Sequence, residues 1–88
     1  MKVTLGKKGC EKTWQYEFPK TTKCWLCKGT ARIGFVAYEG MEKSDSGPLV
    51  SGLHLNKGKG KQWLHDCCAV AVYFCKECLN PTALYNQG

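Results

Sequence analysis

The sequence contains no long hydrophobic run. Its longest uninterrupted apolar stretch is Cys67–Cys75, which is far short of the roughly 20 residues needed to span a bilayer. The first residues, Met1-Lys2-Val3, also do not begin the apolar stretch typical of a secretory signal peptide. Together these absences predict a cytoplasmic protein in a reducing compartment, with no membrane partner.

Large aliphatic side chains are scarce as well. Leu, Ile, Val and Phe account for only 17 of the 88 residues, which is at the edge of what supports a packed core. A chain of this length forms a single domain, residues 1–88, in which residues 1–12 and 80–88 could be flexible termini. Because so small a domain buries only about 60 to 65% of the surface of its unfolded chain, thin cores often depend on metals or disulfides.

Cysteine, by contrast, is abundant, with seven residues. In a reducing compartment a disulfide framework is disfavoured, and clustered cysteines usually bind a metal or carry redox chemistry. The odd number of cysteines favours the same conclusion. The formal charge of +6 would fall to about +4 if four thiolates held one zinc ion.

Four of the cysteines form two pairs with identical spacing, Cys24-Trp25-Leu26-Cys27 and Cys75-Lys76-Glu77-Cys78. Two intervening residues allow a tight turn to bring both sulfurs to one ion. Gly29, shortly after the first pair, is predicted to supply the backbone freedom of that turn. The two pairs predict one tetrahedral Zn²⁺ bound by Cys24, Cys27, Cys75 and Cys78.

This arrangement resembles zinc-ribbon and related zinc-finger modules over the segment Cys24–Cys78, chiefly at the two Cys-x-x-Cys motifs. In those families each pair forms a knuckle at a turn between strands, and the two knuckles hold one structural zinc. The resemblance implies a small zinc-stabilised, mostly-β domain with zinc-ribbon-like antiparallel strands. The intervening segment, residues 28–74, is longer than a minimal ribbon requires.

A third ligand-like pair leaves an alternative open. His65 and Cys68 are also separated by two residues, and Trp63–Cys68 resembles the His-x-x-Cys half of treble-clef, PHD and LIM-type fingers. If this pair completed the site with Cys24 and Cys27, then Cys75 and Cys78 would be core thiols or part of a second site. Ligand type and spacing favour the all-cysteine site.

Alternation with period two dominates the remaining sequence and predicts strands. The predictions are strands at Thr13–Phe18, Thr30–Glu39 and Leu49–Leu55, a glycine-rich hairpin tip at Lys57–Lys61, and a returning strand from Gln62. Within Thr30–Glu39, one predicted face carries Ala31, Ile33, Phe35 and Ala37, and the other carries Arg32, Gly34, Val36 and Tyr38.

The segment Trp63–Leu79 fits either of two structures. Its β-branched and aromatic residues favour a strand over residues 69–74, whereas a helix capped by Asp66 would be the one helix near the C-terminus. Outside the pairs, His54 is interpreted as a surface histidine because no second ligand lies at metal spacing. Cys10 is interpreted as an ordinary thiol in a frayed terminus, although neighbouring lysines would favour a reactive one.

Catalysis is not expected. A catalytic zinc keeps an open coordination position and often has a carboxylate nearby as general base, whereas here four sulfurs would close the site. Asp66 and Glu77 are not paired, and the His-x-Glu of zinc deaminases is absent. The sequence therefore predicts a binding module and not an enzyme.

Two kinds of partner fit the composition. Nucleic acid is favoured because basic residues cluster and could neutralise phosphates while aromatic side chains stack on bases. The predicted contact residues are Lys57, Lys59, Lys61, Lys28 and Arg32. The alternative is a zinc-stabilised protein–protein interaction module that uses exposed aromatics and an edge strand.

Overall fold

The structure, a computed structural model, describes residues 1–40, 48–54 and 63–88. In chain order the elements are β1 (Lys2–Leu5), the 3-10 helix η1 (Gly6–Glu11), β2 (Thr21–Lys23), β3 (Thr30–Tyr38), α1 (Val50–His54), β4 (Cys68–Cys75) and β5 (Pro81–Gln87). All strand pairs are antiparallel. The predicted small, mostly-β antiparallel fold is confirmed, and no helix in the described residues is long and apolar enough to cross a membrane.

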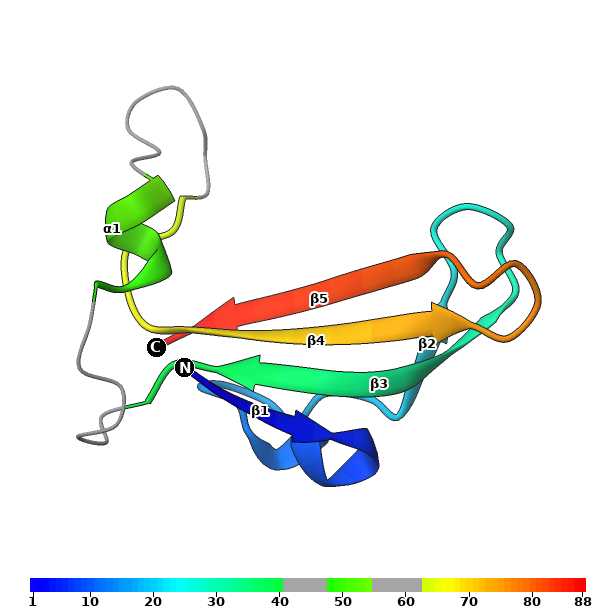
Figure 1. Cartoon of the computed structure of the whole chain (residues 1–88), viewed down its shortest axis with the longest axis horizontal. Helices are drawn as coiled ribbons and strands as arrows, with labels where there is room; N and C mark the ends of the chain where they lie inside the picture. The colour runs from blue at the N-terminus through cyan, green and yellow to red at the C-terminus, as the bar shows by residue number, and fades with distance from the viewer. Residues whose placement is uncertain (41–47, 55–62) are drawn as a thin grey trace.

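The sheet has the strand order β1-β3-β4-β5, with β2 also paired to β3 (Figure 1). β1 pairs with residues 35–38 of β3 and β2 pairs with residues 30–32, so both lie along the edge of β3 that β4 leaves free. β3 and β4, the two longest strands, pair with each other at the centre of the sheet. The turn that follows β4 and the turn between β2 and β3 lie together at one end of the molecule, opposite α1.

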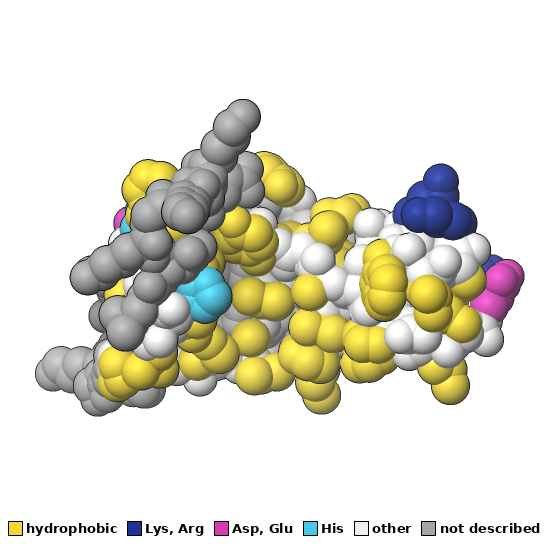
Figure 2. Space-filling model, turned by 90° about the horizontal axis from the view of Figure 1, so that it is seen from above, with side chains coloured by type: hydrophobic (Ala, Val, Ile, Leu, Met, Phe, Trp, Pro, Cys, Tyr) yellow, Lys and Arg dark blue, Asp and Glu magenta, His cyan; other side chains and the backbone are white. Residues whose placement is uncertain are grey.

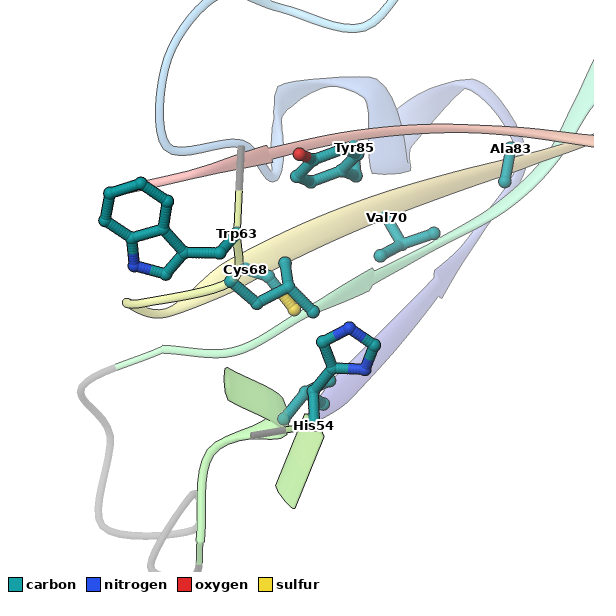
Figure 3. A pocket seen from close by; sticks show the side chains of 8 residues that line it. His54, Trp63, Cys68, Val70, Ala83 and Tyr85 are labelled. Carbon is teal, nitrogen blue, oxygen red and sulfur yellow. The ribbon is translucent and has the colours of Figure 1, made fainter. Parts of the chain in front are cut away.

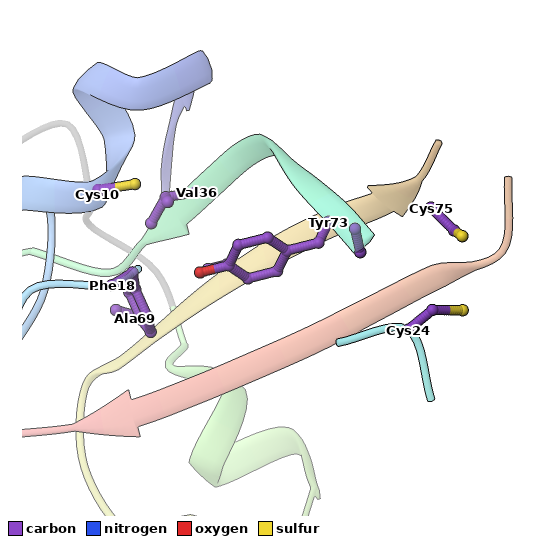
Figure 4. Packing of buried hydrophobic residues seen from close by; sticks show 9 residues of the cluster. Cys10, Phe18, Cys24, Val36, Ala69, Tyr73 and Cys75 are labelled. Carbon is purple, nitrogen blue, oxygen red and sulfur yellow. The ribbon is translucent and has the colours of Figure 1, made fainter. Parts of the chain in front are cut away.

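The core lies on one face of this sheet. β4 points every second side chain into it, and η1 and residues 13–20 cover it from the other side. The buried residues are Cys10, Phe18, Cys24, Ala31, Val36, Ala69, Ala71, Tyr73 and Cys75. Tyr73 is the largest fully buried side chain, and its hydroxyl donates to the Pro19 carbonyl at 2.6 Å. Figure 4 shows Tyr73 along this layer, with Cys24 and Cys75 at the end of it.

The predicted strand Thr30–Glu39 is confirmed as β3, but its predicted faces are wrong beyond Ile33. A β-bulge between Ile33 and Phe35 shifts the register by one residue, and one extra residue reverses every later side chain. Ala31 and Val36 are consequently both fully buried. Gly34 occupies the bulge, where an added Cβ would lie 2.6 Å from the Phe74 ring.

No strand forms at Thr13–Phe18, contrary to the prediction. The Thr13 side chain donates to the Tyr16 carbonyl at 2.8 Å and accepts from the Gln15 amide at 3.3 Å, and these local bonds hold a bend in place of a strand. The aromatics there do not share a face. Trp14 stacks on Tyr38 with ring centroids 5.2 Å apart, whereas Phe18 is buried and Tyr16 is exposed.

The predicted strand Leu49–Leu55 is also wrong, since Val50–His54 forms the short helix α1. Leu49 and Leu53 are four residues apart, a spacing that fits a helical turn as well as a strand face. The amides of Gly52 and Leu53 both donate to the Leu49 carbonyl. In the segment 63–79 the strand is confirmed as β4, and the alternative C-terminal helix does not form.

Both chain ends contribute strands to the sheet. β5 forms one edge of the sheet and β1 lies with β2 along the other, although the sequence suggests that residues 1–12 and 80–88 could be flexible. Cys10 lies in the core with no exposed surface, and burial raises the pKa of its thiol. The interpretation of Cys10 as an ordinary thiol therefore stands, but its placement in a frayed terminus is wrong, and its burial does not favour the reactive alternative. The predicted hairpin at Lys57–Lys61 and the residue Gln62 lie outside the described residues, and residues 63–67 carry no strand.

Glu39 joins α1 to the sheet. Its buried carboxylate accepts hydrogen bonds from the amides of Cys68 at 3.0 Å and Val50 at 2.9 Å. Burial raises the pKa of Glu39, but hydrogen bonds from Cys68 and Val50 outweigh it and hold that pKa below the usual value. The stabilisation is therefore fully present above the pKa of unfolded glutamate and is lost as the pH falls through the lower folded pKa.

Glu39→Gln is expected to lower the free energy of unfolding at neutral pH by about 1 to 3 kcal/mol, because the new NH₂ group cannot accept from an amide N–H. Urea unfolding across the acidic range measures this loss and its disappearance at low pH. Glu11→Gln, at an exposed glutamate, is the matched control and should change little. Equal unfolding midpoints for Glu39→Gln and wild type would contradict the role of Glu39.

Candidate metal centre

The two cysteine pairs form knuckles with the same backbone hydrogen bonds. In the first, the Lys28 amide donates to the Cys24 carbonyl and the Cys24 amide donates to the Gly29 carbonyl. In the second knuckle, residues 75–80, the amides of residues 79 and 75 make the equivalent bonds at 3.0 and 3.2 Å. Identical spacing thus gives identical turns, one between β2 and β3 and the other between β4 and β5.

The turn residue with positive φ differs from the prediction. Lys28 and Leu79, each directly after the second cysteine of its knuckle, adopt φ of 66° and 65°, and Gly29 does not have positive φ. Glycine at position 29 instead avoids crowding between the two knuckles. A Cβ there would lie 3.1 Å from the Glu77 carboxylate and 3.3 Å from the Cys27 sulfur, so glycine allows the second knuckle to approach the first.

The geometry of the four sulfurs fits a tetrahedral ion. The ligand atoms of Cys24, Cys27, Cys75 and Cys78 all lie within 4.8 Å of one another. The Cys24–Cys78 and Cys27–Cys75 sulfur separations are 3.7 and 3.4 Å. A tetrahedral site with metal–sulfur bonds of about 2.3 Å needs sulfurs about 3.8 Å apart, whereas a disulfide needs about 2.05 Å. The four cysteines are therefore arranged to bind a metal ion.

Hydrogen bonds from backbone amides lower the pKa of two of these four thiols and so favour their thiolate forms. Hydrogen bonds from the amides of Cys78 and Glu77 lower the pKa of the Cys75 thiol to about 6, and a backbone hydrogen bond at Cys27 likewise lowers the pKa of Cys24. At Cys27 the Gly29 amide lowers the pKa, but hydrogen bonds with Cys75 and Cys78 outweigh it and raise the pKa to about 12. Metal binding would therefore displace the remaining protons.

The alternative ligand pair, His65 and Cys68, lies elsewhere. Cys68 begins β4 and Cys75 ends it, so about 23 Å of strand separates them at about 3.3 Å per residue. His65 precedes β4 at the same end as Cys68, and its ring lies beside Trp63. Because Cys24 and Cys27 lie beside Cys75, His65 and Cys68 cannot share their ion. His54 is exposed, as expected.

The predicted nucleic-acid contacts divide into two groups. Lys57, Lys59 and Lys61 lie outside the described residues, whereas Lys28 and Arg32 are exposed near the metal site. Lys23 and Lys76 belong to the same surface, because Lys23 pairs with Thr30 and the Lys76 amide donates to the Thr30 carbonyl. In Figure 2 the Lys and Arg side chains visible on this face gather at the end that carries the knuckles.

Trp25 is an anchored yet exposed aromatic at the first knuckle. Its indole NH donates to the Pro81 carbonyl at 2.9 Å and its amide donates to the Thr82 hydroxyl at 3.2 Å, while 60% of the residue remains exposed. Neither this anchoring nor the contribution of Lys76 was evident from sequence, because both depend on pairing between segments about 50 residues apart. The spacing of the cysteine pairs was the only pointer to that pairing.

Comparisons with protein families, with curated proteins and with solved structures found no match for this chain.

Proposed function

We propose that the chain is a structural zinc module in which Cys24, Cys27, Cys75 and Cys78 hold one Zn²⁺ and perform no catalysis. The observation that carries the proposal is the set of four sulfurs at tetrahedral spacing. Four thiolates fill the coordination sphere of zinc and leave no position for a water or substrate. Such a site joins the turn before β3 to the turn after β4 at one end of the sheet and leaves binding to the surrounding surface.

The surface around the knuckles supports nucleic acid as the partner. Lys23, Lys28, Arg32 and Lys76 are exposed there, and Glu77 is the acidic residue of the second knuckle. Lysine and arginine side chains neutralise phosphates, and an exposed indole can stack on an unpaired base. Because the Trp25 indole already donates a hydrogen bond to the Pro81 carbonyl, it would lose little conformational freedom on stacking. Lys57, Lys59 and Lys61 remain predicted contacts outside the residues that the structure describes.

Replacing three of these cations should weaken nucleic-acid binding and its salt dependence together. The variant combines Lys28→Asn, because asparagine tolerates a φ of 66°, with Arg32→Gln and Lys76→Gln. Each lost phosphate contact should reduce the salt slope by about 0.7 for single strands or about 0.9 for duplex. Fluorescence anisotropy with labelled oligonucleotides, measured over a salt series, provides both quantities.

A matched triple variant, Lys2→Gln, Lys8→Gln and Lys12→Gln, removes the same charge from the β1–η1 surface and should keep the slope. A second set, Lys57→Gln, Lys59→Gln and Lys61→Gln, tests the other predicted contacts. An unchanged slope in both test sets would reject these surfaces. Wild-type protein without salt-sensitive binding to any oligonucleotide would reject nucleic acid as the partner.

A protein-interaction module is the second candidate, and one observation favours it. The sheet face opposite the core is apolar and substantially exposed at Val3, Leu5, Phe74 and Tyr85. Binding through such a face would depend weakly on salt, in contrast to phosphate binding. The salt series therefore separates the two candidates.

A further inference from the structure

The sheet has a second apolar face. Side chains alternate between faces along a strand, and the register assigns those that oppose the core. From β1 these are Val3 and Leu5; from β3, Arg32, Phe35 and Ala37; from β4, Cys68, Val70, Val72 and Phe74; and from β5, Pro81, Ala83, Tyr85 and Gln87. We name this set the open face. The register of β2 adds Thr21 and Lys23, which lie opposite Arg32 and Thr30, so the charged members are Lys23 and Arg32, both near the knuckles.

The open face is exposed over much of its area. The exposed fractions are 55% for Val3, 76% for Leu5, 43% for Phe74 and 44% for Tyr85. Figure 2 shows a surface where apolar side chains predominate between the grey segment and the knuckle end. The bulge contributes directly, because it turns Phe35 outward, where its ring lies 6.4 Å from that of Phe74.

Among the described residues, α1 and the segment before β4 cover only one end of this face. Between them and the sheet lies a hollow of about 380 Å³ lined by Val50, His54, Trp63, Leu64, Cys68, Val70, Ala83 and Tyr85. Figure 3 shows the His54 and Trp63 side chains at its rim, with Val70, Ala83 and Tyr85 on its floor. Phe74, near the other end of β4, does not line this hollow.

A sheet with two apolar faces normally has a layer packed on each. Here η1 and residues 13–20 form that layer on the core side, while in the part of the chain that the structure describes the open face has only the partial cover at α1 and the segment before β4. Contiguous exposed apolar surface of this kind on a small protein marks an interaction site. Among the described residues, charge on this face is confined to Lys23 and Arg32 near the knuckles, so a strongly charged partner would find few counter-charges over the rest of it.

We propose that the open face packs against the open face of a second copy of this chain. Two sheets pack face to face about 10 Å apart with interdigitating side chains, and a twofold axis makes the same patch complementary to itself. Four strands about 4.8 Å apart and about 25 Å long give a footprint on the order of 500 Å² before side-chain relief is counted. A standard interface uses about 800 Å² of accessible surface per partner, so we expect the dimer to be a weak one.

Charge also fits this pairing. The chain carries a formal +6, so two copies repel at long range, but among the residues that the structure describes the cations on the surface that would be joined are confined to Lys23 and Arg32 at its knuckle end. Raising the salt concentration should therefore screen the repulsion and tighten the dimer. Binding of a phosphate polymer would respond in the opposite direction, so the two associations can be told apart.

The test is sedimentation equilibrium of the metal-loaded protein over a concentration range reaching 200 µM. Wild-type protein should form a dimer that tightens in high salt. Tyr85→Lys and Phe74→Lys, each measured alone, should raise the dimer dissociation constant by at least about 100-fold, since a charge replaces a central anchor. The metal content and circular dichroism of each variant establish that it is folded. Phe74→Lys also removes the contact between Phe74 and Gly34, which can itself impair folding. Tyr85→Lys does not affect that contact and therefore tests the dimer independently.

Tyr16→Lys is the matched control, because it places the same charge at an exposed aromatic outside the sheet. It should leave the dimer intact. A wild-type monomer at 200 µM would overturn the proposal, as would a dimer that both open-face variants leave unchanged. Weakening of the dimer by Tyr16→Lys to the same extent as by the open-face variants would also overturn it.

Discussion

Complete removal of the metal by a strong chelator is expected to unfold the domain. Tyr73 and Val36 are the only large hydrophobic side chains other than cysteine that are fully buried among the described residues. Cys24 and Cys75 are themselves core residues, so loss of the ion would leave thiolates or thiols to pack alone. Apparent zinc-binding free energies of about 10 to 16 kcal/mol are comparable to or larger than the whole stability of a typical domain, about 5 to 15 kcal/mol.

Circular dichroism during titration with chelator, with native mass spectrometry of the same samples, measures this loss. The bound mass should correspond to one zinc per chain, and elemental analysis separates zinc from iron, which tetrahedral sulfur sites also accept. Adding back zinc under reducing conditions should restore the native spectrum and so exclude irreversible oxidation as the cause. A native-like spectrum in protein fully depleted of metal would contradict the structural role of the site.

The sequence predicted the metal centre better than the fold around it. Both knuckles could be predicted because the Cys-x-x-Cys spacing occurs twice, and two such pairs together suit one tetrahedral ion. The choice between Cys75–Cys78 and His65–Cys68 could not be made from spacing alone. It required the strand β4, whose length places the two candidate pairs at opposite ends of the sheet.

The errors in the fold arose where local alternation competes with another interaction. Period two correctly gave β3, but no pattern of apolar residues marks a bulge, and Gly34 at that position reversed the faces beyond it. At Thr13 a side-chain hydrogen bond to the Tyr16 carbonyl stabilises a bend, so the alternating residues that follow do not form a strand. The spacing of four residues between Leu49 and Leu53 is compatible with both a helix and a strand. The Glu39 carboxylate, which accepts a hydrogen bond from the Val50 amide at the start of α1, comes from a distant segment that the local pattern does not reveal.

Substitution of the exposed cysteines, Cys27→Ser and Cys78→Ser, is expected to abolish metal binding and stable folding. These two residues give the clearest test because they are exposed, whereas Cys24 and Cys75 are buried. Serine at an exposed position removes little packing, so the loss must come through the metal. Since zinc sites accept imidazole in place of thiolate, Cys78→His should retain the ion and a folded sheet with lower affinity.

Two control substitutions separate ligand loss from general damage. His65→Ala removes an exposed side chain and Cys68→Ser a buried one, and both should retain one metal ion per chain as measured by native mass spectrometry. Cys68→Ser should still lower stability modestly, because the buried Cys68 side chain also contacts Glu39. If Cys27→Ser and Cys78→Ser kept the ion while His65→Ala lost it, the cluster at the ends of β2 and β4 would not be the metal site. The sheet would then have to be stable without a metal ion joining its two knuckles. The small core on its buried face makes that energetically unfavourable.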